Sequence, residues 1–203
     1  MYKILILFLL TILVNCITLR KNDLAKYNSA VTVTNPVAKK ITYKLELTTS
    51  AIVNGNNTQT EIAFVNERNK QLNAVIEEAG IFAQSDSGAD FSLHYHIKED
   101  SKTNEALGFF FAFTGGLIPF YIDTNLTSEL EIKNKAGKVL AKIERKESYS
   151  YWGQLFLIFV APFQRPIKKI EDIFRDQMRS SFEEAITKKY FGNYNVNPQP
   201  APE

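Results

Sequence analysis

Four segments of the chain alternate apolar and polar residues, and this period of two restricts the fold to one built around a sheet. The segments lie at residues 41–48, 91–97, 126–132 and 139–143. One face of each is apolar and the other polar, which is typical of strands with one side in a core and one in water. The sequence NKAG at 134–137 is typical of a hairpin connection. The last three segments therefore predict an antiparallel meander.

Two further segments have the period of a helix. Thr58 and Glu61 have the spacing of a capping box that opens the first helix, and Gly80 is placed to end it. A short strand is expected at 81–84. The apolar face of the second helix consists of Ile170, Ile173, Phe174, Met178, Phe182, Ala185 and Ile186. The fold class expected is α+β, a mostly antiparallel sheet with two helices packed on one face, in the order β-α-(β)-β-β-β-α.

The two ends of the chain lack a core pattern, which sets the expected domain boundaries. We expect a signal peptide at 1–15, a lipidated tether at 16–40, a single α+β domain at 41–190 and a disordered tail at 191–203. The tail contains three prolines between residues 192 and 203. Part of the tether lying against the domain as an edge strand is the alternative.

The start of the chain has the composition of an export signal. Lys3 precedes an apolar run from Ile4 to Val14 that is interrupted at Thr11. A membrane-spanning helix needs about 20 apolar residues, so this run fits a signal peptide better. Cys16 follows the run and is the only cysteine, so no intramolecular disulfide can form.

The sequence Leu-Val-Asn-Cys at 13–16 resembles a bacterial lipobox of the relaxed kind. The resemblance implies diacylglyceryl transfer to the Cys16 thiol, cleavage before that residue and acylation by palmitate-like chains. It also implies a cell-envelope location, and Ile17 in place of an aspartate favours the outer membrane over the inner membrane. The alternative is an uncleaved N-terminal membrane helix, which the charged Arg20 and Lys21 disfavour.

The order of elements over residues 41–190 resembles small secreted lipoproteins, including the lipopolysaccharide-assembly lipoprotein and several uncharacterised families. Two local stretches are similar to uncharacterised lipoproteins. They are GLIP at 116–119 and YWG at 151–153 followed by APF at 161–163. Neither stretch has a known chemistry, so the resemblance implies an envelope protein without naming an activity.

Two uncharged apolar segments, 106–122 and 155–163, stand out from the rest of the domain. The predicted meander places both at the same end of the sheet, where they either form one exposed patch or fold back onto the sheet as extended strand ends. In the second case Phe109, Phe111 and Phe113 face one way. The residues expected to contact a membrane or a partner are Phe109, Phe110, Phe111, Phe113, Leu117, Ile118, Phe120, Trp152, Leu155, Phe156 and Phe159.

Candidate catalytic and metal-binding residues are few. His94 and His96 are the only histidines, and their spacing on a strand points both rings to one face. A zinc site needs more ligands than these two, so two solvated or helix-covered histidines are the simpler interpretation, and we expect no metal and no cofactor. No nucleophile-elbow, P-loop or dinucleotide-binding motif occurs.

The charge is nearly balanced, with 24 Lys and Arg against 22 Asp and Glu, which disfavours nucleic acid as a partner. Three functions remain. The first is a non-enzymatic accessory or interaction module at the membrane. A lipid on Cys16 holds it there, and a membrane protein is a candidate partner. The second is a periplasmic carrier or binder of a lipid or other apolar ligand. The third, an enzyme, is the least supported.

Overall fold

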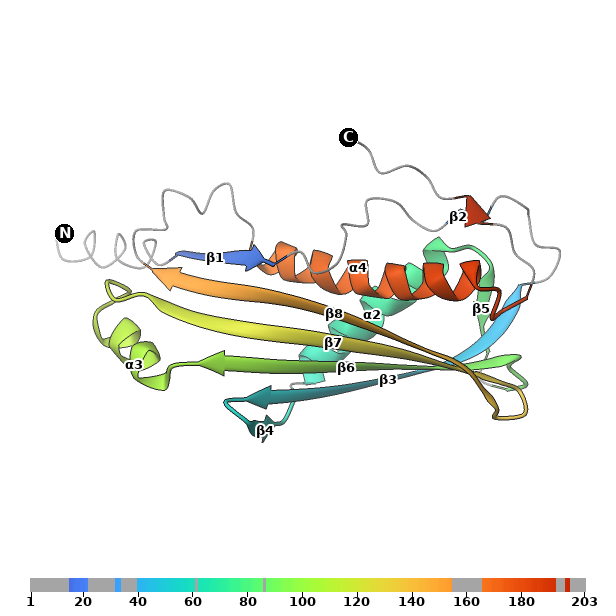
Figure 1. The fold of residues 1–203 in the computed structure, drawn as a ribbon, viewed down its shortest axis with the longest axis horizontal. Helices are drawn as coiled ribbons and strands as arrows, with labels where there is room; N and C mark the ends of the chain where they lie inside the picture. Colours follow the sequence, from blue (N-terminus) through green and yellow to red (C-terminus); the bar gives the residue numbers. More distant parts are fainter. Residues whose placement is uncertain are drawn as a thin grey trace, which may run out of the picture.

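The computed structural model describes residues 15–21, 32–33, 40–60, 62–85, 87–154, 166–192 and 196–197. A seven-stranded mixed sheet has the order β1-β8-β7-β6-β3-β4, with β5 beside β3 (Figure 1). Its strands are β1 (Asn15–Arg20), β3 (Ile41–Val53), β4 (Asn56–Thr58), β5 (Phe82–Gln84), β6 (Phe91–Thr103), β7 (Phe120–Asn134) and β8 (Val139–Gln154). The helices are α2 (Ile62–Glu78), α3 (Glu105–Phe113) and α4 (Pro166–Thr187). A separate pair joins β2 (Thr32–Val33) to β9 (Val196–Asn197).

The predicted meander is confirmed, because β6, β7 and β8 pair antiparallel in sequence order. The turn between β7 and β8 is closed by the Gly137 amide, which donates to the Asn134 carbonyl at 2.8 Å. Strand β3 pairs parallel with β6, because the connection between them passes through α2. The short strand predicted at 81–84 is β5.

The α+β class and the mostly antiparallel sheet are confirmed, but the number of helices is not. Helices α2 and α4 contribute to one core with one face of the sheet, and α3 is a third described helix at the end of the sheet. The Asn104 side chain accepts from the Leu107 amide and caps α3, while Gly115 and Gly116 adopt positive φ after it. The expectation of extended strand ends at 106–122 is therefore wrong where α3 forms.

The core lies between the helices and alternate residues of the strands. Leu93, Tyr95 and Ile97 of β6 are at most 1% exposed, as the period of two predicts. The predicted apolar face of α4 is buried too, apart from Ile170, which is half-buried. Sequence periodicity therefore identified the buried residues of both the sheet and α4.

The start of α2 differs from the predicted capping box. The helix begins at Ile62, whereas Thr58 belongs to β4 and its hydroxyl donates to the Asn56 carbonyl. Glu61 lies outside the described residues. The predicted end is confirmed, since Gly80 has a φ of 71° and its amide donates to the Glu77 carbonyl.

The chain ends are more closely joined to the domain than a tether and a disordered tail imply. Strand β1 pairs with β8 along all six of its residues, so Asn15–Arg20 is the edge strand that the sequence left as an alternative. At the other end, Phe191 is buried in the core and β9 pairs with β2. The signal peptide expected at 1–15 lies outside the described residues except for Asn15.

Candidate functional site

Helix α3 connects β6 to β7 at one end of the sheet (Figure 1). It packs on β7 through one side. Gly108 faces Phe120, and a β-carbon there would lie 3.5 Å from the Phe120 ring. The Phe111 ring is also near Phe120, with 5.8 Å between the centroids. The absence of a side chain at residue 108 lets the helix approach β7 closely, and Phe111 fills the space beside it.

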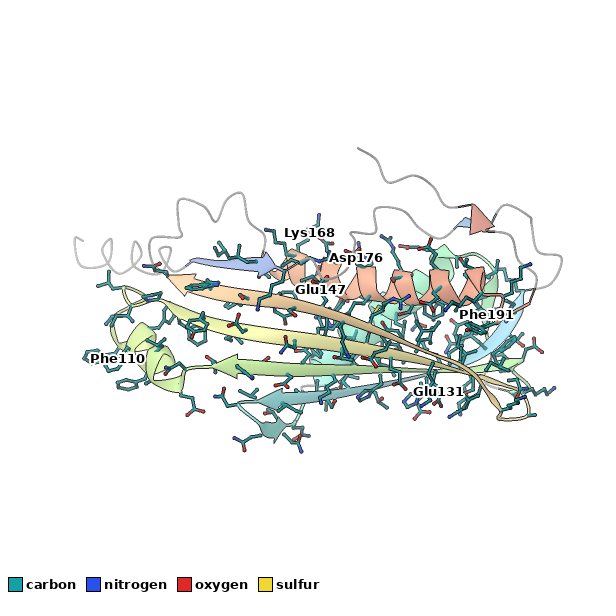
Figure 2. All side chains as sticks on the ribbon, in the orientation of Figure 1. Phe110, Glu131, Glu147, Lys168, Asp176 and Phe191 are labelled. Carbon is teal, nitrogen blue, oxygen red and sulfur yellow. The ribbon has the colours of Figure 1, made fainter. Side chains whose placement is uncertain are left out.

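The opposite side of α3 presents large apolar side chains to solvent. Phe109, Phe110 and Phe113 are 65%, 47% and 79% exposed, and Leu117 in the following turn is 53% exposed. The rings of Phe109 and Phe113 stack on each other at 6.2 Å rather than on the sheet. Figure 2 shows Phe110 on α3 at one end of the sheet. We call these four side chains the α3 patch.

The turn that follows α3 satisfies its own backbone. The amides of Thr114, Gly115, Gly116 and Leu117 donate to carbonyls of residues 110–114. The Ile118 amide donates to the Thr114 hydroxyl, which itself donates to the Phe110 carbonyl at 2.7 Å. Five consecutive amides therefore need neither water nor another chain as a partner.

Strand β1 brings Cys16 to the same end of the sheet as the α3 patch. In the pairing register Cys16 lies opposite Gly153 of β8, and Gly153 lies opposite Phe120 of β7. Adjacent strands are about 4.8 Å apart, so the Cys16 backbone is about 10 Å from that of Phe120. Trp152, 37% exposed and stacked on Tyr121 at 5.2 Å, occupies the next row. Sequence reasoning placed Cys16 on a tether and did not predict this proximity.

The predicted contact residues fall into three groups. The exposed ones are Phe109, Phe110, Phe113, Leu117 and Trp152. Phe111, Ile118 and Phe120 are half-buried, and Leu155, Phe156 and Phe159 lie outside the described residues. Of the two interpretations of segment 106–122, the structure supports the exposed patch. Within the described ranges, none of the helices combines the length and apolar character needed to cross a membrane.

A buried ion cluster attaches β1 to the domain. The Arg20 guanidinium donates to Glu147 of β8 at 2.9 Å and also bonds Asp176 of α4. The side chains of Arg20, Glu147 and Asp176 are only 10%, 0% and 7% exposed. Burial lowers the pKa of Arg20, but the bonds to the two carboxylates outweigh it and the net shift is upward. Sequence reasoning missed this cluster, because nothing in the local pattern relates residues 20, 147 and 176.

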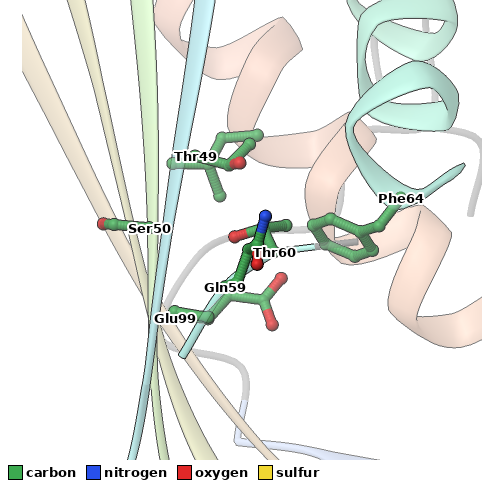
Figure 3. Close-up of a pocket in the computed structure, with 8 residues that line it drawn as sticks. Thr49, Ser50, Gln59, Thr60, Phe64 and Glu99 are labelled. Atoms are coloured by element: carbon green, nitrogen blue, oxygen red, sulfur yellow. The ribbon is translucent and has the colours of Figure 1, made fainter. Parts of the chain in front are cut away.

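A buried carboxyl group, that of Glu99, lines a pocket between α2 and the sheet (Figure 3). The pocket has a volume of about 220 Å³, and Phe64, Ile97 and Glu99 are among its lining residues. Glu99 Oε1 is buried and has no hydrogen-bond partner among the described residues. Burial raises the pKa of Glu99, against the opposing charge of Arg68. The Arg68 guanidinium carbon lies 3.4 Å from the Phe174 ring centroid and 4.5 Å from that of Phe64.

The alternation of β6 contained a signal for Glu99. Leu93, Tyr95 and Ile97 face the core. Glu99 is the next residue on the same face of β6, and it has a carboxyl group where an apolar side chain is expected. An acid at a core position needs a special environment, because a buried charge is costly unless it is paired. That departure from the pattern could have identified the pocket.

Glu99 leads to a prediction about stability and pH. A raised pKa in the folded state means that stability is present at low pH and is lost as the pH rises through that pKa. Glu99→Gln has no such loss, so the melting temperature of the variant relative to wild type should increase as the pH rises above 4.5, the ordinary value for a glutamate. Thermal unfolding from pH 4 to pH 8 measures this. Asp100→Asn, next to it on the other face, is the control, and a pH-independent difference for Glu99→Gln would refute the prediction.

The two histidines lie on the sheet face opposite the helices. The Thr48 hydroxyl is 3.0 Å from His94 Nε2 and 2.8 Å from His96 Nδ1. In the pairing register these rings face Glu131 and Glu129 of β7. No group of three or more potential metal-binding side chains occurs in the described part of the chain. The histidines therefore belong to a polar, hydroxyl-bonded surface.

No family model and no curated protein matches the sequence. Among solved structures, a DUF330 family protein from Xanthomonas campestris matches with 12% identity and a TM-score of 0.32, covering 79% of this chain and 98% of that one. A PelC variant from Paraburkholderia phytofirmans, solved as a dodecamer, matches with 11% identity and a TM-score of 0.26, covering 81% and 97%. At these scores neither similarity supports a conclusion about function.

Proposed function

We propose that the protein is a membrane-anchored envelope lipoprotein that acts as a non-enzymatic accessory or interaction module at the membrane. A lipid on Cys16 holds it at the membrane, and the α3 patch is the surface through which it interacts. The observation that carries the proposal is the register that brings Cys16 level with Phe120, directly beside α3. Ile17 after the cysteine favours the outer membrane.

The energetics of the α3 patch support this proposal. Full burial of a Phe or Leu side chain is worth about 1.5–3 kcal/mol, so four of them represent roughly 6–12 kcal/mol at most. Contiguous exposed apolar surface on a soluble protein usually marks an interface with a partner or a membrane. An anchor placed at the same end of the sheet keeps this surface close to the bilayer and to proteins within it.

The surroundings of the titratable groups whose pKa is shifted support a non-enzymatic role. Lys133 and Lys142 lower the pKa of Glu131 to about 2 on the open face of the sheet. Arg20 is held between two carboxylates that attach β1. Glu99 lies at a pocket, but the histidines are on the opposite face of the sheet and provide no base for it. Arg20 and Glu131 belong to structural ion pairs, and Glu99 and the histidines do not converge on one cleft as an acid and a base would.

The carrier alternative has weaker support. Ligand pockets usually measure 300–1,000 Å³, and the pocket beside Glu99 is smaller, at about 220 Å³. Its floor also contains a carboxyl group, which an acyl chain cannot satisfy. The pocket is therefore poorly suited to a lipid.

Metabolic labelling with a clickable palmitate analogue tests the anchor. We expect wild-type protein to be labelled and to sediment with membranes, because the Cys16 thiol accepts the lipid. Cys16→Ser should be unlabelled and largely lost from the membrane fraction after a carbonate wash. Exported wild-type protein that carries no label would refute lipidation at Cys16.

A further inference from the structure

We propose that α3 inserts into the acyl layer of the same leaflet that holds the lipid on Cys16, so that the bilayer, and not another protein, covers the α3 patch. This inference rests on the proposed anchor. It specifies the partner of the surface and the orientation of the domain, with the α3 end of the sheet against the membrane and the hairpin at 134–137 away from it.

The anchor leaves α3 little freedom to move away from the membrane. Cys16 belongs to β1 itself, so no flexible spacer separates the lipidated residue from the sheet. Arg20 fixes the other end of β1 through its bonds to Glu147 and Asp176. The lipid on Cys16 and α3 therefore belong to one rigid unit. The Cys16 backbone lies about 10 Å, or two strand spacings, from that of Phe120, and Gly108 of α3 packs against Phe120. Acyl chains attached at Cys16 bring the α3 patch to the membrane surface.

The backbone of the segment suits a medium without water. Lipid offers no hydrogen-bond partners, so each backbone group that enters it must be satisfied internally. The turn at 114–118 meets this condition for its donors, because five consecutive amides are bonded inside the segment. Residues 106–122 also contain no charged side chain. Segment 106–122 therefore contains few polar groups that would lose their hydration on entering lipid.

The polarity along α3 indicates how deep it reaches. Glu105 in the first turn accepts from the Asn54 side chain at 3.3 Å, and both residues are exposed. Phe113 and Leu117 lie at the other end, so the C-terminal end enters the acyl layer and the first turn stays in water. Nine residues are too few to span a bilayer, and α3 is an interfacial helix.

The composition of the α3 patch favours lipid over a protein partner. Protein interfaces contain about one hydrogen bond per 100–200 Å² and have polar rims. Between Phe109 and Phe113 every exposed residue of α3 is apolar, and Glu105 in the first turn is the only charged residue of the helix. Lipid requires no polar complement, so such a surface is complete for a bilayer and incomplete for a specific protein interface.

Fluorescence quenching by brominated lipid tests the insertion in the full-length, acylated protein. Trp152 is the only tryptophan, and Trp152→Phe removes the background signal. Phe110→Trp then reports from α3. Val139→Trp is the matched control, because Val139 is 42% exposed at the opposite end of β8. The vesicles contain phosphatidylethanolamine and phosphatidylglycerol with brominated acyl chains. We expect the tryptophan at 110 to lose most of its fluorescence and the one at 139 to lose none.

The palmitate label read on the same samples separates this inference from the anchor. Labelled protein whose tryptophan at 110 is unquenched, or is quenched no more than the one at 139, would overturn the insertion and leave the anchor standing. Unlabelled protein would overturn the anchor. In that case quenching at 110 after addition to vesicles would still support the insertion, and its absence would overturn that as well.

Discussion

Replacing Phe109 and Phe113 with serine in the Cys16→Ser protein is expected to weaken binding to phosphatidylethanolamine–phosphatidylglycerol vesicles by about 100-fold or more. The two side chains are 65% and 79% exposed, so little of the folded structure depends on them. Each contributes about 1.5–3 kcal/mol when it is fully immersed in an apolar medium. Vesicle co-sedimentation at increasing lipid concentration measures the change, and the melting temperature should stay within a few degrees of wild type.

Two controls make this result specific to the α3 patch. Val139→Ser removes an exposed apolar side chain at the far end of the sheet and should leave vesicle binding unchanged. Phe111→Ser removes the ring that packs on Phe120 and should lower the melting temperature instead. If the Phe109 and Phe113 double variant kept full vesicle affinity, α3 would not be the membrane-binding element. Phe111 is thus unsuitable for testing binding, although its sequence position resembles that of its neighbours.

Arg20→Met is expected to destabilise the domain by about 3–5 kcal/mol, because it removes the cation that bonds two buried carboxylates, Glu147 and Asp176. The loss should shrink as the pH falls, since removing a cation raises the pKa of a buried carboxyl and its protonated form is tolerated. Urea unfolding at pH 5 and pH 7.5 measures both effects. Lys21→Met is the matched control, because Lys21 and its partner Asp123 are half-exposed and such pairs contribute at most about 1 kcal/mol.

The same variant tests the rigid unit of anchor and sheet. Without Arg20, β1 keeps its backbone pairing with β8 and the bond from Lys169 to the Thr18 carbonyl, but it loses the ion pair with Asp176 of α4. If β1 detaches, the lipid on Cys16 would hold the domain through a flexible leash, and quenching of a tryptophan at 110 should fall. A loss of stability no larger than that of Lys21→Met would show that the cluster does not hold β1 in place. Arg20→Lys, which keeps one charge, should lie between the two.

Local pattern was sufficient for most of the domain. The alternation at 91–97 and 126–132 predicted β6 and β7, and NKAG at 134–137 predicted the hairpin between β7 and β8. The face of α4 was also predicted, because a helix with a 3.6-residue apolar period has only one side to bury. These elements depend on neighbours in the sequence, which is the information that periodicity contains.

Segment 106–122 shows where local pattern was insufficient. Five of its residues are phenylalanines, which suit strands as well as buried helices. An apolar run with almost no polar residues also lacks the alternation from which the period of a helix or a strand is recognised. Asn104 as the cap and Gly108 against Phe120 decide for a helix, and the second of these contacts exists only in the folded sheet. The exposed phenylalanines then follow from the shortness of α3, which has one side on β7 and nothing described against the other.

Sequence alone determined the α+β class, the meander and the two long helices. Tertiary structure alone decided that β1 joins the edge of the sheet, that Arg20 meets carboxylates from β8 and α4, and that Cys16 lies level with Phe120. The physical reason is the range of the interactions. Hydrophobic period and turn chemistry act over a few residues, whereas strand pairing and buried ion pairs join positions more than 100 residues apart, and no local pattern records those partners.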